Sequence, residues 1–199
     1  DIMMHTMERY FSKYEDATLT DAIAEALLRT VKDAVFEVLK NPEDYRNRAA
    51  IMWASSLSHN DLTECGTEKD FASHKLEHEL SGLFGVTHGA GLAALWPSWA
   101  RYVKDKHLNR FVQFAVNVMG IENDFSHPDE TAEKGIRAIE DFYHKIGMPT
   151  NIHELLGREI TIDEIEEMVN KCSRGGTITL GAMEVLDTND MRNIYMMAR

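Results

Sequence analysis

The sequence predicts an all-α protein, a multi-helix bundle without a substantial sheet. Apolar residues recur every three or four positions over most of the 199 residues, which is the period of helices with one buried face. The 4 prolines stand at expected breaks between such stretches, at positions 42, 97, 128 and 149. Only residues 175–181, GGTITLG, alternate like a β-strand, and because one short strand cannot form a stable sheet, we expect a loop there.

Two helical segments open the chain. Residues 1–11, DIMMHTMERYF, have helical periodicity, and a long helix follows in TLTDAIAEALLRTVKDAVFEVLKNPEDY. Thr18 or Thr20 is expected to cap the free amides at its start, and Asn41 with Pro42 is expected to end it and begin the next helix. The buried stripe of the long helix should comprise Ile23, Leu27, Val31, Val35 and Val38 or Leu39.

A histidine-bearing helix lies in the middle of the sequence. The preceding helix carries YRNRAAIMWASSLSHNDL, and the polar residues 63–69 separate the two. Gly82 and Gly85 are expected to close the histidine-bearing helix, and a turn at 86–91 leads into a short helix. Helical periodicity returns in HLNRFVQFAVNVMG, DETAEKGIRAIEDFYHKIG and TIDEIEEMVNKC.

Two local signals and four large side chains refine this prediction. Thr161 and Glu164 have the spacing of a capping box, and Gly147, Met148 and Pro149 should form a helix-stopping loop. We expect the space between helices to be filled by Met52, Trp53, Trp96 and Trp99.

The charge balance argues against two classes of partner. With 33 acidic and 21 basic residues the formal net charge is −12, so nucleic acid and anionic membrane surfaces are repelled. No apolar run reaches the roughly 18 to 20 residues that a membrane span needs. Cys65 and Cys172 lack the spacing of a disulfide framework or a thiolate metal site, which favours a cytoplasmic setting. The start of the sequence directly in a helix, without Met, suggests a piece of a longer protein.

Several histidines have spacings that suit a metal site. Asp1 with His5, and His74 with His78, are four residues apart and share a helix face, and His88 lies in a glycine-containing turn. Carboxylate and imidazole donors suit Zn²⁺ or Fe²⁺. Spacing alone does not choose among these residues, although Lys75 after His74 argues against the HExxH pattern of zinc proteases. Ordinary surface or core positions are expected for His59, His107, His127, His144 and His153.

Two separated motifs resemble one enzyme family. DIMMHTMERYF is similar to the Asp-x-x-x-His helix of the iron-containing (group III) alcohol dehydrogenases, and HKLEHELSGLFGVTHGAGLAALWPSW resembles their H-x-x-x-H signature followed by HG and a proline. The final LDTNDMRNIYMMA resembles their C-terminal helix, and butanol dehydrogenase-like members look most similar. The resemblance implies a dehydroquinate synthase-like helical domain spanning 1–199. Its metal ligands would be Asp1, His5, His74 and His88.

The same resemblance implies an activity and the partners it needs. A divalent metal, Fe²⁺ or Zn²⁺, would polarise a small alcohol or aldehyde for hydride exchange with NAD(P)H. The nicotinamide cofactor would be bound mainly by an N-terminal α/β domain that is absent from this chain, and a homo-oligomer is possible. His78 would line the active site, where it would relay a proton or, equally well, orient His74 or a water.

Two other function classes compete with this one. The histidines could be structural parts of a helical interaction module whose apolar face docks on another domain. A metal-dependent hydrolase of the HD-domain kind needs an adjacent His-Asp doublet, whereas Asn60 separates His59 from Asp61 in SHND. Metal analysis of a His74→Ala variant would distinguish a metal enzyme from an interaction module.

Overall fold

The computed structural model describes residues 1–14 and 16–199, and helices account for its regular structure. Within these residues the β-structure is limited to a single antiparallel bridge between Leu180 and Leu186, so the predicted loop at 175–181 is confirmed. The α-helices are α1 (Ile2–Tyr10), α2 (Thr18–Lys40), α3 (Tyr45–His59), α4 (Ala72–Phe84), α5 (His88–Val103), α6 (Leu108–Asn117), α7 (Pro128–Lys145), α8 (Ile152–Leu156), α9 (Ile162–Cys172) and α10 (Thr188–Ala198), with 3₁₀ turns η1 (Leu62–Glu64) and η2 (Lys104–Lys106).

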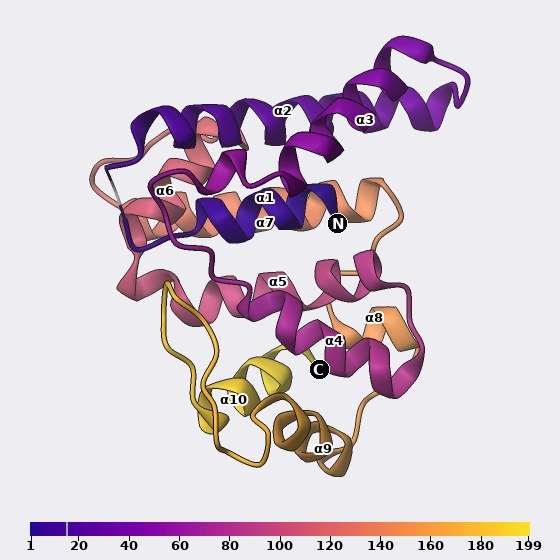
Figure 1. Ribbon diagram of the computed structural model, residues 1–199, viewed down its shortest axis with the longest axis vertical. Coiled ribbons are helices and arrows are strands. Elements are labelled where there is room, and N and C mark those ends of the chain that lie inside the picture. Colours follow the sequence, from indigo (N-terminus) through magenta and orange to yellow (C-terminus); the bar gives the residue numbers. More distant parts are fainter. Residues whose placement is uncertain (15) are drawn as a thin grey trace.

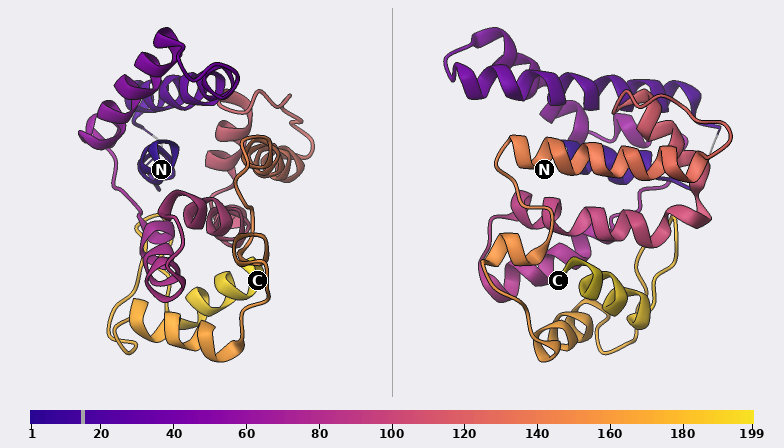
Figure 2. Two further views of the ribbon diagram at one scale, coloured as in Figure 1. Left: turned by 90° about the vertical axis from the view of Figure 1, so that its right-hand side faces the viewer. Right: turned by 180° about the vertical axis from the view of Figure 1, so that it is seen from behind.

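The helices form two groups that meet along α5 (Figure 1). The first group contains the long α2–α3 hairpin together with α1, α6 and α7, and the second contains α4, α8, α9 and α10. The views in Figure 2 show the same division, with α1 running inside the first group. Because α5 packs against α4, α7, α8 and α10, it links the two groups and places its N-terminus near that of α1.

A continuous apolar core joins both groups. Its centre is an aromatic cluster in which Phe11 contacts Phe111 and Trp96, with ring centroids 4.7 and 5.5 Å apart. Trp96 and Trp99 are fully buried, as predicted. The burial of these large rings contributes about 2–3 kcal/mol each to folding.

The predicted burial of Met52 and Trp53 is wrong. Both side chains lie on the outer face of α3, 70% and 65% exposed respectively. The reason is that α3 is the outer helix of the hairpin, and among its residues only Ala54 and Ser58 are buried. The spacing of apolar residues predicted a helix there, but it did not show that the face carrying Met52 and Trp53 would have no neighbouring helix.

The ends of the helices agree with several local signals. The α2 stripe is confirmed, with Leu27 and Val31 buried and Val38 half-buried, and α2 ends before Asn41. Thr161 and Glu164 form the predicted capping box of α9. At these helix ends the residue that predicts the boundary and the group it contacts lie within one helical turn of each other.

Two helix ends differ from the prediction. Neither Thr18 nor Thr20 caps α2, because Ala17 takes the N-cap position and both threonines lie inside the helix. The Thr20 hydroxyl donates to the carbonyl of Cys65, 2.7 Å away. Gly85 ends α4 with a left-handed φ of 65°, whereas Gly82 lies inside the helix.

Pro97 also lies elsewhere than predicted, in the interior of α5 rather than at a break. A proline inside a helix removes one hydrogen bond and costs about 3 kcal/mol. The helix continues nevertheless, because α5 is buried around most of its circumference and the packing of Trp96 and Trp99 outweighs that penalty. No helix in the described part of the chain combines the length and apolar character needed to cross a bilayer.

Candidate metal centre

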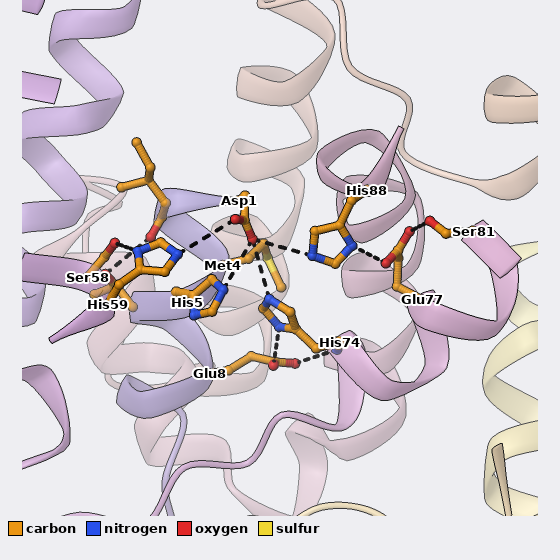
Figure 3. Close-up of polar contacts among 12 residues, drawn as sticks. Asp1, Met4, His5, Glu8, Ser58, His59, His74, Glu77, Ser81 and His88 are labelled. Atoms are coloured by element: carbon orange, nitrogen blue, oxygen red, sulfur yellow. Dashed lines mark hydrogen bonds and ion pairs between the residues drawn. The ribbon is translucent and has the colours of Figure 1, made fainter. Parts of the chain in front are cut away.

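Three helix N-termini bring the predicted ligands to one place (Figure 3). Asp1 precedes α1 and His5 lies one turn into it, His74 is in the first turn of α4, and His88 is the first residue of α5. The loops before α4 and α5 hold these helix starts beside α1, so Asp1 and His5 lie close to His74 and His88, which are 69 to 87 positions further along the chain.

The Nε2 atoms of the three histidines surround one carboxylate oxygen of Asp1. The Nε2 atoms of His74, His5 and His88 lie 3.4, 3.5 and 3.6 Å from Asp1 Oδ1. Donors about 2.1 Å from one ion at tetrahedral angles are about 3.4 Å apart, so these separations suit a shared cation. Asp1, His74 and His88 have donor atoms within 4.8 Å of one another, and His5 forms a second such set with Asp1 and His59.

Glu8 fixes the orientation of His74. Its carboxylate Oε2 lies 2.5 Å from His74 Nδ1, and Oε1 accepts from the backbone N–H of His74 at 3.1 Å. With its proton on Nδ1, the ring leaves Nε2 as a lone pair, and that buried atom has no hydrogen-bond partner. An unpartnered, buried nitrogen facing a carboxylate is what a cation-binding imidazole looks like in the absence of its ion. The residues present therefore fit a divalent metal.

Glu77 does the same for His88. This fully buried carboxylate contacts His88 Nδ1 through Oε2, and the Ser81 hydroxyl donates to its other oxygen. Gly91 makes room for Glu77, because a Cβ at that position would lie 2.4 Å from Glu77 Oε1. Two of the three imidazoles thus have a carboxylate behind them, an arrangement that fixes the tautomer and raises the basicity of metal-binding histidines.

The third imidazole, His5, is kept neutral by its surroundings. Burial, and then the proximity of His74, lowers the pKa of His5 to about 3. Its Nδ1 lies 3.4 Å from the Arg9 guanidinium, which repels a further positive charge on the ring. Because a guanidinium only donates, this contact favours the tautomer with the proton on Nε2, and binding a cation through Nε2 requires the other tautomer. Neutral imidazole is the form that binds metal ions.

His78 lies apart from the nitrogens around Asp1. It is exposed on α4, and its ring centroid is 5.6 Å from that of His88 and 6.3 Å from that of His74. The i,i+4 pair is therefore divided, with His74 facing Asp1 and His78 facing solvent beside His88. That position is accessible to a substrate or a water.

Three residues of the centre were missed by sequence reasoning: Glu8, Glu77 and His59. Each carboxylate sits in an ordinary helical stretch, and nothing in its spacing indicates a histidine partner on another helix. His59 was expected at an ordinary position, but its Nε2 lies 3.7 Å from Asp1 Oδ2. The other lone histidines pair with carboxylates elsewhere, namely His107 with Glu184, His127 with Asp124, His144 with Glu154 and His153 with Glu159.

An apolar cavity of about 220 Å³ adjoins the centre. Asp1 and Gly89 form its edge toward the metal centre, and its other walls are apolar side chains. They include Val31, Val35, Ile51, Ala93, Phe142, Tyr143, Ile146 and Met148.

Comparison with known proteins identifies the family to which a chain with this fold belongs. The C-terminal part of the Fe-containing alcohol dehydrogenase family matches residues 1–198. The chain therefore belongs to the Fe-containing alcohol dehydrogenase family, which confirms the resemblance inferred from its two motifs.

Individual relatives agree with this assignment. The chain is 36% identical over 197 residues to NADH-dependent butanol dehydrogenase A of Clostridium acetobutylicum, covering 98% of this chain and 49% of that protein. It is 31% identical over 199 residues to NADPH-dependent aldehyde reductase YqhD of Escherichia coli, covering 100% of this chain and 50% of the reductase. The chain thus spans about half the length of the curated relatives it matches.

Solved structures show the same fold. The substrate- and cofactor-free aldehyde reductase YqhD of E. coli superimposes with a TM-score of 0.90 at 31% identity, over 100% of this chain and 51% of that one. NADH-dependent butanol dehydrogenase A of Thermotoga maritima gives a TM-score of 0.90 at 30% identity, over 100% of this chain and 50% of that one. The all-helical fold class is confirmed. Membership of this family argues against the metal-dependent hydrolase hypothesis. Asp61, the acidic residue of SHND in that hypothesis, forms an ion pair with Arg9 at 3.0 Å.

Proposed function

We propose that this chain forms the metal-binding half of the active site of an NAD(P)H-dependent alcohol dehydrogenase or aldehyde reductase. The observation that carries the proposal is the convergence of three imidazole Nε2 atoms within 3.6 Å of Asp1 Oδ1, one of them buried without a partner. Relatives named as butanol dehydrogenases and an aldehyde reductase support the substrate class.

Asp1, His5, His74 and His88 would hold a divalent cation, Fe²⁺ or Zn²⁺. Three neutral imidazoles and one carboxylate leave part of the ion's charge uncompensated. When bound, such a cation supplies Lewis-acid polarisation of an alcohol or carbonyl oxygen. Glu8 and Glu77 keep Nε2 of His74 and His88 directed at it.

His78 would handle the proton that accompanies hydride exchange. Its exposed imidazole beside His88 can accept the alcohol proton and pass it to solvent, or hold a water in position for that transfer. The nicotinamide cofactor would be bound by the half of the relatives' length that this chain does not span. Each of these roles can be tested by substituting the residue concerned.

The apolar cavity would receive the carbon chain of the substrate. Its walls are apolar, whereas its edge toward the metal centre carries Asp1. A molecule with one oxygen and an aliphatic tail matches this distribution, because the tail is removed from water at about 0.8 kcal/mol per methylene.

The proposal is tested by turnover of butanal with NADH or NADPH, measured with the cofactor-binding half of the relatives supplied as a second polypeptide. We expect metal-dependent nicotinamide oxidation that His74→Ala abolishes together with metal binding, and that His127→Ala leaves unchanged. His127 is exposed and its side chain pairs with Asp124 on the surface, so it controls for the loss of a histidine. Absence of turnover in a protein that holds one equivalent of metal would contradict the proposal.

A Val35→Phe substitution tests the substrate cavity. Val35 is half-buried on α2 and lines the cavity, so a larger ring there should occupy the space meant for the aliphatic tail. We expect KM for hexanal to rise by roughly tenfold or more, while KM for acetaldehyde and kcat for both change little. Val38→Phe is the matched control, because Val38 is half-buried on the same helix but lines a different groove. Equal effects of the two substitutions would exclude this role for the cavity.

A further inference from the structure

Phe71 has a backbone conformation that large side chains rarely adopt. It is the residue before α4, and its φ of 55° and ψ of 20° are left-handed. For any residue with a Cβ, this conformation brings that atom close to the following carbonyl oxygen and costs free energy. The Phe71 side chain also makes no capping hydrogen bond to the helix that it precedes. The local backbone therefore does not favour a phenylalanine here, and the contacts of its ring must explain it.

Asp70 holds this conformation in place. Its buried carboxylate accepts from the backbone N–H of Ala72 at 2.9 Å. The other carboxylate oxygen accepts from the N–H groups of Ala182 and Met183, also at 2.9 Å. The N–H of Asp70 itself donates to the carbonyl of Glu8 at 2.8 Å. The strained turn is thus fixed by bonds to α1, to α4 and to the loop before α10, and strain maintained in this way is typical of functional sites.

The ring of Phe71 contacts two of the predicted metal ligands. Its centroid is 4.8 Å from that of His74, with 35° between the planes, and 5.4 Å from that of His5, edge to face. The two imidazoles also contact each other, with centroids 4.5 Å apart. The guanidinium of Arg9 lies over the phenyl ring, 5.0 Å from its centroid. Aromatic rings at these distances attract one another, so the phenyl ring restricts how both imidazoles turn about their side-chain bonds.

His5 depends on this contact more than the other imidazoles do. His74 and His88 each have a carboxylate behind Nδ1, which fixes the orientation of the ring. His5 has the Arg9 guanidinium there, and in the tautomer that binds a cation through Nε2 this donor gives the ring no support. The ring of His59 also lies against it, 3.9 Å away between centroids, but that side chain is exposed. The phenyl ring is therefore the more rigid of the two groups that orient His5.

We infer that Phe71 is a positioning residue of the metal centre, whose ring directs Nε2 of His5 and His74 toward Asp1. The inference rests on the proposed function and adds to it a residue without a metal-binding atom. A glycine at position 71 would remove the backbone strain, but it would also remove the ring. The centre thus accounts for a phenylalanine in a left-handed conformation.

Phe71→Leu and Phe71→Tyr test this with Co²⁺ as the probe, because the visible absorption of bound Co²⁺ reports the arrangement of its ligands. Phe71→Leu keeps an apolar side chain but loses the ring. We expect it to raise the dissociation constant for Co²⁺ by about tenfold or more and to change the absorption band. Phe71→Tyr keeps the ring and should match the unaltered protein in both. Urea unfolding of the metal-free variants shows that each is folded, and Phe71→Met replaces Phe71→Leu should the latter not fold.

Phe84→Leu is the matched control. Phe84 is half-buried like Phe71 and ends the same helix, and the guanidinium of Arg158 lies over its ring, 5.3 Å from the centroid. This substitution should leave the dissociation constant and the absorption band unchanged. A phenyl ring at position 71 that only fills space would lower the urea midpoint in Phe71→Leu without altering the band.

An unchanged dissociation constant and absorption band in Phe71→Leu would overturn the inference. Equal effects of Phe71→Leu and either Phe71→Tyr or Phe84→Leu would overturn it as well, because the ring at position 71 would then not be the cause. His74→Leu separates this inference from the proposed function. If His74→Leu alone lost Co²⁺, the proposed function would stand without Phe71, and if it bound Co²⁺ normally, both would fail.

Discussion

At the scale of single residues, the centre depends on carboxylates that do not themselves face Asp1. Glu8 and Glu77 are among the most deeply buried charged groups of the chain, and each uses its oxygens to hold one imidazole and one further donor. Burying a carboxylate without partners would be strongly unfavourable. Their placement is explained if the imidazoles they hold bind a cation, because the ion offsets the buried negative charge.

Substituting Glu8→Gln should weaken metal binding without unfolding the protein. The amide oxygen can still accept from the His74 backbone N–H, but the negative charge behind Nδ1 is lost. We expect the dissociation constant for Zn²⁺ or Fe²⁺ to rise about 10- to 100-fold, measured by competition with a chromophoric chelator. Glu68→Gln, on the surface beside Lys13, should leave the constant unchanged. An unaltered constant in Glu8→Gln would show that Glu8 is only structural.

Two glycines at the start of α5 should respond differently to an added methyl group. At Gly91 a Cβ would lie 2.4 Å from Oε1 and 2.8 Å from Cγ of the buried Glu77, so Gly91→Ala must displace the side chain that holds His88. At Gly89 the nearest atom, Asp1 N, is 3.6 Å away, an ordinary contact.

We expect Gly91→Ala to lower the free energy of unfolding by about 1–3 kcal/mol and to weaken metal binding, whereas Gly89→Ala changes stability by less than about 1 kcal/mol. Urea unfolding and metal titration of both variants check this. Equal behaviour of the two would mean that Glu77 can move aside freely.

At the scale of elements, close packing of helices decides where glycine is needed. The α6–α7 pair is in intimate contact at Gly135, where an added Cβ would lie 2.5 Å from the Cβ and 2.9 Å from the Cα of Ala115. The second distance involves backbone, so only a shift of one helix could relieve it. Gly82 in α4 is exposed, and a methyl group added there would have no heavy atom of another side chain or element within 4 Å.

Gly135→Ala and Gly82→Ala should therefore change the free energy of unfolding in opposite directions. Alanine is favoured over glycine inside a helix by about 1 kcal/mol, and at Gly82 that gain is not opposed. At Gly135 overpacking of about 1–3 kcal/mol exceeds it. We expect Gly82→Ala to raise the midpoint of urea unfolding and Gly135→Ala to lower it. Stabilisation by both would show that α6 and α7 can separate easily.

At the scale of the whole molecule, a buried polar network ties α2 to α6. Arg110 donates to Asp21 Oδ2 at 2.5 Å and to the carbonyl of Tyr14 at 2.6 Å, and both charged side chains are buried. The network continues to Glu25, which accepts from the Tyr10 hydroxyl at 2.9 Å. Burial raises the pKa of this phenol, and the negative charges of Glu25 and Asp21 raise it further. The two bonds of Arg110 join residues 89 and 96 positions apart in the sequence.

Substitutions of Asp21 and Arg110 should not be additive, because the two side chains interact directly. Arg110→Met leaves a buried carboxylate without its guanidinium, and we expect a loss of about 3–5 kcal/mol in the free energy of unfolding. The double variant Asp21→Asn, Arg110→Met should lose less than the sum of the two single variants. Chemical denaturation of the three proteins measures the coupling, and additive losses would contradict a direct interaction.

Features that depend on residues close together in the sequence were predicted, whereas features that depend on contacts between distant helices were not. The α2 stripe, the α9 capping box and the turn at Gly85 depend on residues within one or two helical turns, and all were predicted. The burial of Trp53, the continuation of α5 through Pro97 and the bond of Thr20 to Cys65 depend on helices far away in the chain. Those were not predictable, because local periodicity does not specify a neighbour.

The sequence by itself determined that this chain is helical, acidic and a member of its dehydrogenase family, since periodicity, charge and two motifs are properties of short stretches. It also nominated Asp1, His5, His74 and His88. Only the tertiary structure decided that Glu8 and Glu77 stand behind the imidazoles and that His59 faces Asp1. The physical reason is that hydrogen bonds and ion pairs between helices depend on their relative placement, which the packing of the whole core sets.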